Sequence, residues 1–276
     1  MNSSREFCDA FVDAYQALAI NDRAALYLFG KKESQRRGIA MPSLQTLGES
    51  ALLRHFPGAI RELKLPSESF QSWKHSVSSA NLLSGDFGNK SSGRIDNAVQ
   101  LSGEAPRALV ELKAWCTGDV VKNSGRAWRD DQPAKHNIRK AFDIDWLKME
   151  AYANFTKSPD CLRVIVTAFF TVAVDECRDV RDCKGASGSR KELRRLMMQH
   201  LERVGHPSSY RSGVVVTPIL NDFDGSSAAL REVAVERVRN SFHQLWPNLH
   251  HEVRNLGRSE AEGVPVYLDL VVSGNR

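Results

Sequence analysis

Apolar residues recur along the chain at two spacings, one typical of helices and one typical of strands. Helical spacing is found over residues 4–19, 23–29, 46–56, 139–155, 189–205 and 230–245. Runs typical of strands cover residues 94–101, 108–115, 162–174, 213–220 and 264–272, and extended structure is also expected at 70–77. Helices and strands that follow one another in this way predict an α/β protein.

Polar stretches divide these elements. Residues 31–38, KKESQRRG, separate the first helices from the rest, so we expect a helical extension over residues 1–40 and one large domain over residues 41–276. Only the turn-forming segment SGEAPR lies between the strands at 94–101 and 108–115. So short a connection favours an antiparallel hairpin.

The composition is that of a globular protein that folds in water. Of the 276 residues, 42% are hydrophobic and 26% are charged, and the longest apolar run, residues 164–174, is too short to span a membrane. The first residues lack the pattern of a secretory signal. The five cysteines form no CxxC pair, which predicts reduced thiols and, with the missing signal, a cytoplasmic protein.

Positive charge is concentrated in two segments. The chain carries a formal net charge of +5. Residues 122–140 hold six basic and two acidic residues, and residues 178–195 hold seven basic and three acidic residues, so each segment carries +4. The rest of the chain therefore carries about −3, and the clustering suits a polyanionic partner such as nucleic acid. A solvated helix face is the alternative explanation for either segment.

Three charged residues of the expected hairpin form the strongest candidate for a catalytic site. Asp96 lies on the first strand, and Glu111 and Lys113 lie two positions apart on the second, so they point to the same face. Two carboxylates on neighbouring strands suit Mg²⁺, which prefers oxygen ligands. A lysine beside them can hold an attacking water and stabilise charge that develops on phosphorus. Metal-dependent hydrolysis of a phosphodiester requires this combination.

The segment that carries them, GRIDNAVQLSGEAPRALVELKAW at positions 93–115, resembles the PD-(D/E)xK nuclease superfamily of restriction endonucleases, repair nucleases and phage exonucleases. The resemblance implies a restriction-endonuclease-like core, with a mixed central β-sheet flanked by helices. Asp96 would begin the second core strand, and Glu111 and Lys113 would lie on the third. One position departs from the family name, because Ile95 stands where the proline would be.

The resemblance also implies a set of metal ligands. Asp96 and Glu111 would bind the ion through their carboxylates, and Leu112 would bind it through its backbone carbonyl. Many members add a glutamate from the helix before the core sheet, and Glu49 is the candidate for that role. Thr46 and Glu49 also have the spacing of a capping box, which explains the glutamate without a metal.

The context of the triplet matters more than the triplet itself. By chance about two acidic-x-Lys triplets are expected in a chain of this length. The chain has three, Glu62-Leu-Lys64, Glu111-Leu-Lys113 and Asp182-Cys-Lys184. Only the second combines an apolar β-type lead-in with an upstream Asp. The alternative is a half-exposed strand that carries a surface Glu and Lys.

Two further sets of residues have competing explanations. The basic loop after the third core strand could contact a nucleic-acid backbone or stack on a base, or it could be a solvated loop. Its candidate residues are Lys122, Arg126, Trp128, Arg129 and Lys135. Asp143 and Asp145 are interpreted as residues that cap the helix at 139–155 or favour its positive N-terminal end.

Taken together, these patterns predict a Mg²⁺-dependent DNA nuclease, with a restriction-type endonuclease as the leading form and Mn²⁺ as a substitute ion. RNA is an alternative substrate, and cleavage of both DNA strands would favour a homodimer. The alternative from a different class is a nuclease-fold protein that binds nucleic acid or a protein partner without cutting. The intact carboxylate pair and lysine favour the enzyme.

Overall fold

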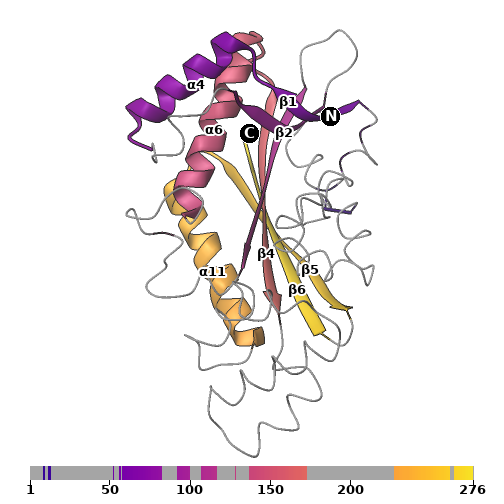
Figure 1. The fold of residues 1–276 in the computed structure, drawn as a ribbon. Coiled ribbons are helices and arrows are strands. Elements are labelled where there is room, and N and C mark those ends of the chain that lie inside the picture. The colour runs from indigo at the N-terminus through magenta and orange to yellow at the C-terminus, as the bar shows by residue number, and fades with distance from the viewer. Residues whose placement is uncertain are drawn as a thin grey trace, which may run out of the picture.

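The fold is known from a computed structural model, which describes residues 9, 12–13, 52, 56, 58–82, 92–99, 107–116, 128, 137–172, 227–261 and 264–275. In these ranges the chain forms strands and helices in the following order (Figure 1): β1 (Ala59–Lys64), α4 (Ser67–Ser79), β2 (Arg94–Val99), β3 (Ala108–Cys116), α6 (Ile138–Phe155), β4 (Leu162–Val172), α11 (Ser227–Leu245), β5 (His250–Ala261) and β6 (Val264–Gly274). The prediction of an α/β protein is therefore confirmed.

One mixed sheet of six strands joins the two halves of the chain, in the order β1-β2-β3-β4-β6-β5. Neighbouring strands run antiparallel except for β3 and β4, which are parallel and are connected through α6. A parallel pair needs a crossover of this kind, whereas a short turn suffices for an antiparallel pair. The expected hairpin of β2 and β3 is confirmed by their antiparallel pairing, in which Val99 is opposite Ala108.

The helices α4, α6 and α11 lie along the same side of the sheet (Figure 1), and the largest buried cluster fills the space between. Phe142 of α6 stacks on Trp246, which follows α11, with 3.9 Å between the ring centroids. Phe242 of α11 packs edge-on against both rings. Arg231 binds the buried Asp269 of β6 with two hydrogen bonds, of 2.6 and 2.5 Å. These contacts attach α11 to both α6 and the sheet.

Helix α6 begins one residue before the predicted range and ends at the predicted residue. Its N-cap is Asn137, whose side chain accepts a hydrogen bond from the backbone N–H of Lys140 at 2.8 Å. Asp143 and Asp145 lie inside the helix, so the interpretation of these residues as caps is wrong. Asn137 caps the helix instead, and the side chains of both aspartates bind other groups.

The prediction of extended structure at 70–77 is also wrong, because these residues belong to α4. Phe70, Trp73 and Val77 are all buried, and their spacing of three and four residues is that of one helix face. The helix starts directly after Pro66. This proline fits a helix boundary, since it restricts the residue before it to extended conformations.

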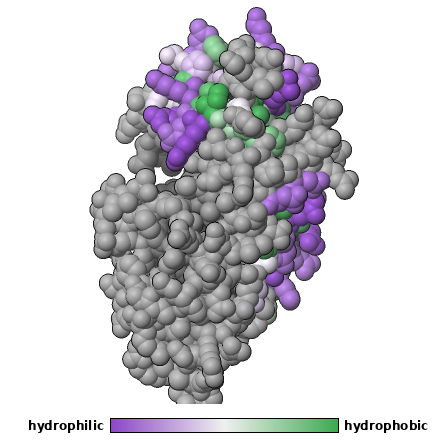
Figure 2. Space-filling view, turned by 90° about the vertical axis from the view of Figure 1, so that its right-hand side faces the viewer, coloured by the Kyte–Doolittle hydropathy of each residue, from purple (hydrophilic) through white to green (hydrophobic). Residues whose placement is uncertain are grey.

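Two strands that the sequence did not predict lie at the edges of the sheet. β1 is mostly exposed, and Figure 2 shows a small hydrophobic area among hydrophilic residues at the end of the molecule where β1 lies. The charged Arg61, Glu62 and Lys64 on this strand discourage pairing with another chain. β5 is irregular, with a register shift between Asn255 and Arg258 and a positive φ of 85° at Gly257. Strands without regular alternation give little signal in a sequence.

The remaining predictions are confirmed or lie outside the described residues. α11, β4 and β6 match the elements expected at 230–245, 162–174 and 264–272 within a few residues. Residues 9, 12, 13 and 52 are helical, as predicted. The described residues do not include the rest of the extension, the boundary at 40/41, the helices at 23–29 and 189–205 or the strand at 213–220. No helix in the described ranges is long and apolar enough to cross a membrane.

Candidate active site

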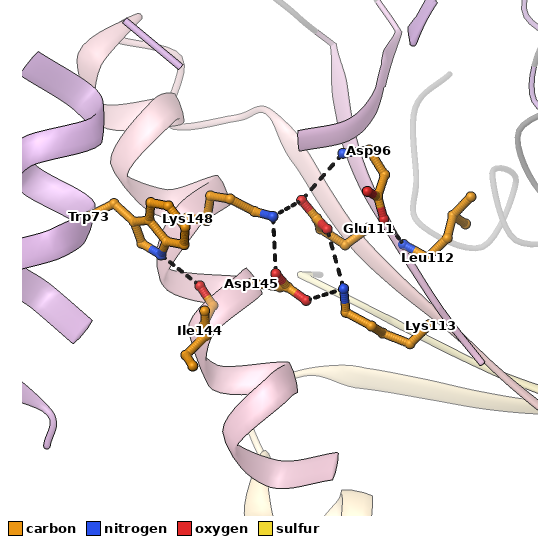
Figure 3. A network of polar contacts seen from close by, with 8 residues as sticks. All are labelled: Trp73, Asp96, Glu111, Leu112, Lys113, Ile144, Asp145 and Lys148. Atoms are coloured by element: carbon orange, nitrogen blue, oxygen red, sulfur yellow. Dashed lines mark hydrogen bonds and ion pairs between the residues drawn. The ribbon is translucent and has the colours of Figure 1, made fainter. Parts of the chain in front are cut away.

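Strands β2 and β3 separate at Asp96. Their ladder pairs Asn97 with Val110 and goes no further toward the start of β2. Beyond this point side chains replace the ladder (Figure 3). The N–H of Leu112 donates to Asp96 Oδ2 at 2.9 Å, and the N–H of Asp96 lies 3.4 Å from Glu111 Oε1. The sheet therefore opens where the carboxylates of Asp96 and Glu111 lie.

The ladder on the other side of Asp96 is also interrupted. β1 pairs Arg61 with Asn97 and Leu63 with Ile95, but the residue between them, Glu62, has a φ of 51°. This left-handed conformation costs a non-glycine residue about 1 kcal/mol or more. Backbone strain of this kind concentrates at functional sites, where the surrounding structure maintains it. Asp96 thus lies between two interruptions of regular pairing.

Glu111 and Lys113 point toward α6, which supplies two more charged residues (Figure 3). Asp145 and Lys148 are three positions apart and therefore share a face of the helix. Lys113 Nζ lies 2.6 Å from Asp145 Oδ2 and 3.7 Å from Glu111 Oε2. Lys148 Nζ lies 2.6 Å from Glu111 Oε1 and 3.0 Å from Asp145 Oδ1. Each lysine thus contacts both carboxylates.

Burial makes the cluster sensitive to charge. The side chain of Glu111 is fully buried, that of Lys148 is 8% exposed, and that of Lys113 is 27% exposed. Of these two lysines, Lys113 is therefore the more accessible to a substrate. With Asp96, the cluster contains three carboxylates and two ammonium groups. Its formal charge is −1 when all five groups are ionised.

The pKa values follow from burial and from the alternation of charge. Burial raises the pKa of Glu111 well above its usual value, and the positive charges of Lys148 and Lys113 oppose the shift without cancelling it. Burial by itself would raise the pKa of Asp145, but Lys113 and Lys148 outweigh it and lower the pKa. Burial would lower the pKa of each lysine, but Asp145 and Glu111 outweigh it and raise both values. Both lysines are consequently positive at neutral pH.

Trp73 of α4 supports this part of α6. Its indole Nε1–H donates to the backbone carbonyl of Ile144 at 2.9 Å, and its ring centroid lies 5.6 Å from Lys148 Nζ. Only 2% of Trp73 is exposed, so the indole ring makes a buried cation–π contact with the ammonium group of Lys148. Gly93 lies against the same ring, because a Cβ atom there would be 2.7 Å from Trp73 Cζ3. The conformation at the start of β2 is thus linked to the position of α6.

The donor set suits a hard divalent cation. The available atoms are carboxylate oxygens, and Glu111 Oε2 is buried without a hydrogen-bond partner in the described structure. The N–H and C=O of one strand residue point the same way, so the Leu112 carbonyl faces β2 together with its N–H. Within the described ranges no three acidic, His or Cys side chains form a ready-made metal cluster. Both lysines contact Glu111 and Asp145, so a bound metal would have to share Glu111 with them or displace one of them.

The structure brings together four of the residues that the sequence singled out, Asp96, Glu111, Leu112 and Lys113. Glu49 lies outside the described residues, as do Lys122, Arg126, Arg129 and Lys135 of the basic loop. Trp128 is described, and its ring packs edge-on against Phe242 of the core with centroids 6.2 Å apart. Its role in binding nucleic acid stays a prediction.

Sequence reasoning missed Asp145 and Lys148 as members of the cluster. A signal for them was present, because both lie among the apolar positions Ile144, Met149 and Tyr152 of a helix. Charged residues three apart on a buried helix face need partners of opposite charge. The triplet on β3 was the obvious source of such partners.

Comparisons with known proteins provide no counterpart for this arrangement. No protein-family model matches the chain, and no curated protein and no solved structure matches it significantly.

Proposed function

We propose that the chain is a Mg²⁺-dependent nuclease that hydrolyses phosphodiester bonds in DNA, with a restriction-type endonuclease as the leading form. The observation that carries the proposal is the grouping of Asp96, Glu111 and Lys113 where β2 and β3 separate. Lys113 Nζ lies 3.7 Å from Glu111 Oε2, and the Asp96 carboxylate binds the N–H of Leu112, the residue between them. Two of these groups are carboxylates suited to Mg²⁺, and the third is an ammonium group with access to solvent.

The order of the elements supports a restriction-endonuclease-like core. The resemblance implies an Asp on the second core strand, the (D/E)xK triplet on the third, then a helix and a further strand. β1, β2 and β3 are consecutive antiparallel strands, α6 follows, and β4 lies parallel to β3. Asp96 is on the second of these strands and Glu111 on the third.

In this proposal Asp96, Glu111 and the Leu112 carbonyl hold Mg²⁺. The ion, when bound, supplies charge that offsets the phosphate and lowers the pKa of a coordinated water. Lys113 keeps its proton, because Asp145 and Glu111 raise its pKa. It therefore acts as a donor that orients the attacking water and stabilises negative charge on the phosphate, and it is not the general base.

The charge of the cluster supports the same reading. With all five groups ionised the cluster sums to −1, so one divalent cation changes the total to +1. One phosphodiester, which carries a single negative charge, then brings the total to zero. Since uncompensated charge is costly in a buried site, this balance favours one metal ion and one phosphate.

A plasmid-cleavage assay tests the proposal. We expect supercoiled DNA to be cut with Mg²⁺ or Mn²⁺ and to stay intact with EDTA. Lys113→Ala and Glu111→Gln should lower the rate by about a hundredfold or more. The Glu62-Leu-Lys64 triplet provides a matched control for the lysine, because it has the same three residues on an exposed strand. Lys64→Ala, and Glu68→Gln at an exposed position on α4, should cut at the wild-type rate.

Two outcomes would overturn the enzyme proposal. One is the absence of cleavage of DNA and RNA in every form, and the other is equal cutting by wild type and Lys113→Ala. The alternative is then a nuclease-fold module that binds without cutting, which is favoured by the two lysines that already occupy the carboxylates. Salt-dependent binding of uncut DNA would identify that module. Sedimentation of the active protein would test the expected homodimer.

A further inference from the structure

Lys148 is an unusual residue for the middle of a packed helix. Its side chain is 8% exposed, and burying an ammonium group is costly unless its charge is compensated. Here Glu111 Oε1 at 2.6 Å and Asp145 Oδ1 at 3.0 Å provide the compensation. The ring of Trp73 lies on another side, 5.6 Å from the ammonium. The ammonium is thus surrounded in the way that a bound cation would be.

The contact with Glu111 places Lys148 in competition with a metal. In the proposed function Glu111 is a metal ligand, and a Mg²⁺–oxygen distance is about 2.0–2.1 Å. Mg²⁺ on this carboxylate would lie within a few ångströms of the Lys148 ammonium. Two positive charges this close repel each other strongly in a mostly buried site. Binding of the ion therefore weakens the contact between Lys148 and Glu111.

We propose that Lys148 is a resident counter-ion that occupies the metal-binding carboxylate in the metal-free protein and leaves Glu111 when a divalent cation binds. The inference rests on the proposed function, because it takes Glu111 as a metal ligand. Asp145 keeps the displaced ammonium within the site, since its Oδ1 already contacts Lys148 and its Oδ2 contacts Lys113. Lys148 is then a positioning residue. Its positive charge compensates the buried carboxylates and so stabilises the folded protein in the absence of metal.

The proposal predicts opposite effects for two neutral substitutions. Lys148→Met removes the competing charge, so metal affinity should increase by about tenfold or more, although the metal-free protein becomes less stable. Asp145→Asn leaves Lys148 with Glu111 as its only close anionic partner among the described residues and lowers the negative charge of the site. Metal affinity should then decrease by about tenfold. A Lys148 that only supports the fold would give weaker metal binding when replaced.

Isothermal titration calorimetry with Mn²⁺ and with Mg²⁺ measures these affinities directly and does not depend on activity. Circular dichroism first shows that each variant is folded. Lys157→Met is the matched control, because it removes one positive charge from an exposed position just after α6. Its affinity should stay within about twofold of the wild type. If the wild type binds metal and cuts DNA but folded Lys148→Met binds metal no more tightly than the wild type, this inference is overturned and the proposed function is not.

A second measurement applies if Lys148→Met and the more polar Lys148→Gln do not fold. Displacement of the ammonium changes the environment of the Trp73 ring, so saturating Mg²⁺ should alter the tryptophan emission of the wild type. Trp73→Phe should lack this change while still binding Mg²⁺ in calorimetry. Metal binding without any Trp73-dependent change would refute the displacement. Failure of the wild type to bind Mg²⁺ or Mn²⁺ would instead overturn the proposed function, and this inference with it.

Discussion

The carboxylate of Asp145 lies 2.6 Å from the ammonium group of Lys113, across the interface between α6 and β3. Its second oxygen contacts Lys148, so one carboxylate of the helix forms ion pairs with two buried or half-buried lysines. Neither lysine has another close anionic partner in the described structure except Glu111. The stability of the cluster should therefore depend strongly on Asp145.

Replacing Asp145 with Asn should destabilise the metal-free protein by about 3 kcal/mol, because two ammonium groups would then share the single carboxylate of Glu111. Urea denaturation in EDTA measures the free energy of unfolding. Asp160→Asn, at an exposed position beyond the same helix, is the control and should change it by less than about 0.5 kcal/mol. A similarly small loss for Asp145→Asn would mean that the ion pairs contribute little.

Gly93→Ala should destabilise the protein by about 2 kcal/mol through overpacking. The added Cβ atom would lie 2.7 Å from Trp73 Cζ3 and 2.8 Å from Leu65 Cδ1, and the hydrogen bond from Trp73 to Ile144 restricts the indole. Trp73→Phe removes the clashing ring atoms, so Gly93→Ala should cost less in a Trp73→Phe background. A double-mutant cycle from denaturation curves measures this coupling. Additive effects would show that Gly93 acts independently of Trp73.

Stability should fall between pH 7.5 and pH 5 because of His251. Burial lowers its pKa, the hydrogen bond from Nε2 to the Trp246 carbonyl opposes this, and His243 and His250 lower the pKa further. The folded pKa is therefore below the unfolded value of 6.5, and the unfolded chain binds more protons between the two values. The stability contributed by neutral His251 is complete above the unfolded pKa. It is lost as the pH falls toward the folded pKa.

The loss should flatten below the folded pKa of His251. Urea denaturation at a series of pH values measures it for the wild type and for His251→Gln, which should lack this component of the slope. His75→Gln, at an exposed position on α4, is the control. The same slope in wild type and His251→Gln would assign the pH dependence to other groups.

Local pattern was sufficient for the elements that carry the predicted site. The short turn between the strands at 94–101 and 108–115 predicted their antiparallel pairing, which places Asp96 next to Glu111. The same approach misjudged residues 70–77. A short segment with three apolar residues fits either a strand or a helix in the sequence alone. In the structure the segment is helical, and Trp73 contacts α6 through its hydrogen bond to Ile144.

The pairing of residues distant in sequence had no local signature. Asp145 was interpreted as a helix cap, although Asn137 fills that position and Asp145 faces Lys113. Charged residues within a helix give the same local pattern whether they face solvent or a buried partner. The crossover from β3 to β4 through α6 places α6 against the sheet, and this packing determines that Asp145 faces a buried partner.

The sequence by itself determined that Asp96, Glu111 and Lys113 meet, because strand periodicity and a short turn are local properties. Only the tertiary structure decided that Asp145 and Lys148 join them and that a lysine occupies the carboxylate proposed to bind metal. The physical reason is that burial and Coulombic attraction depend on distances between elements, and packing of α6 on the sheet sets those distances. The separation of β2 and β3 at Asp96 is likewise a property of the assembled sheet.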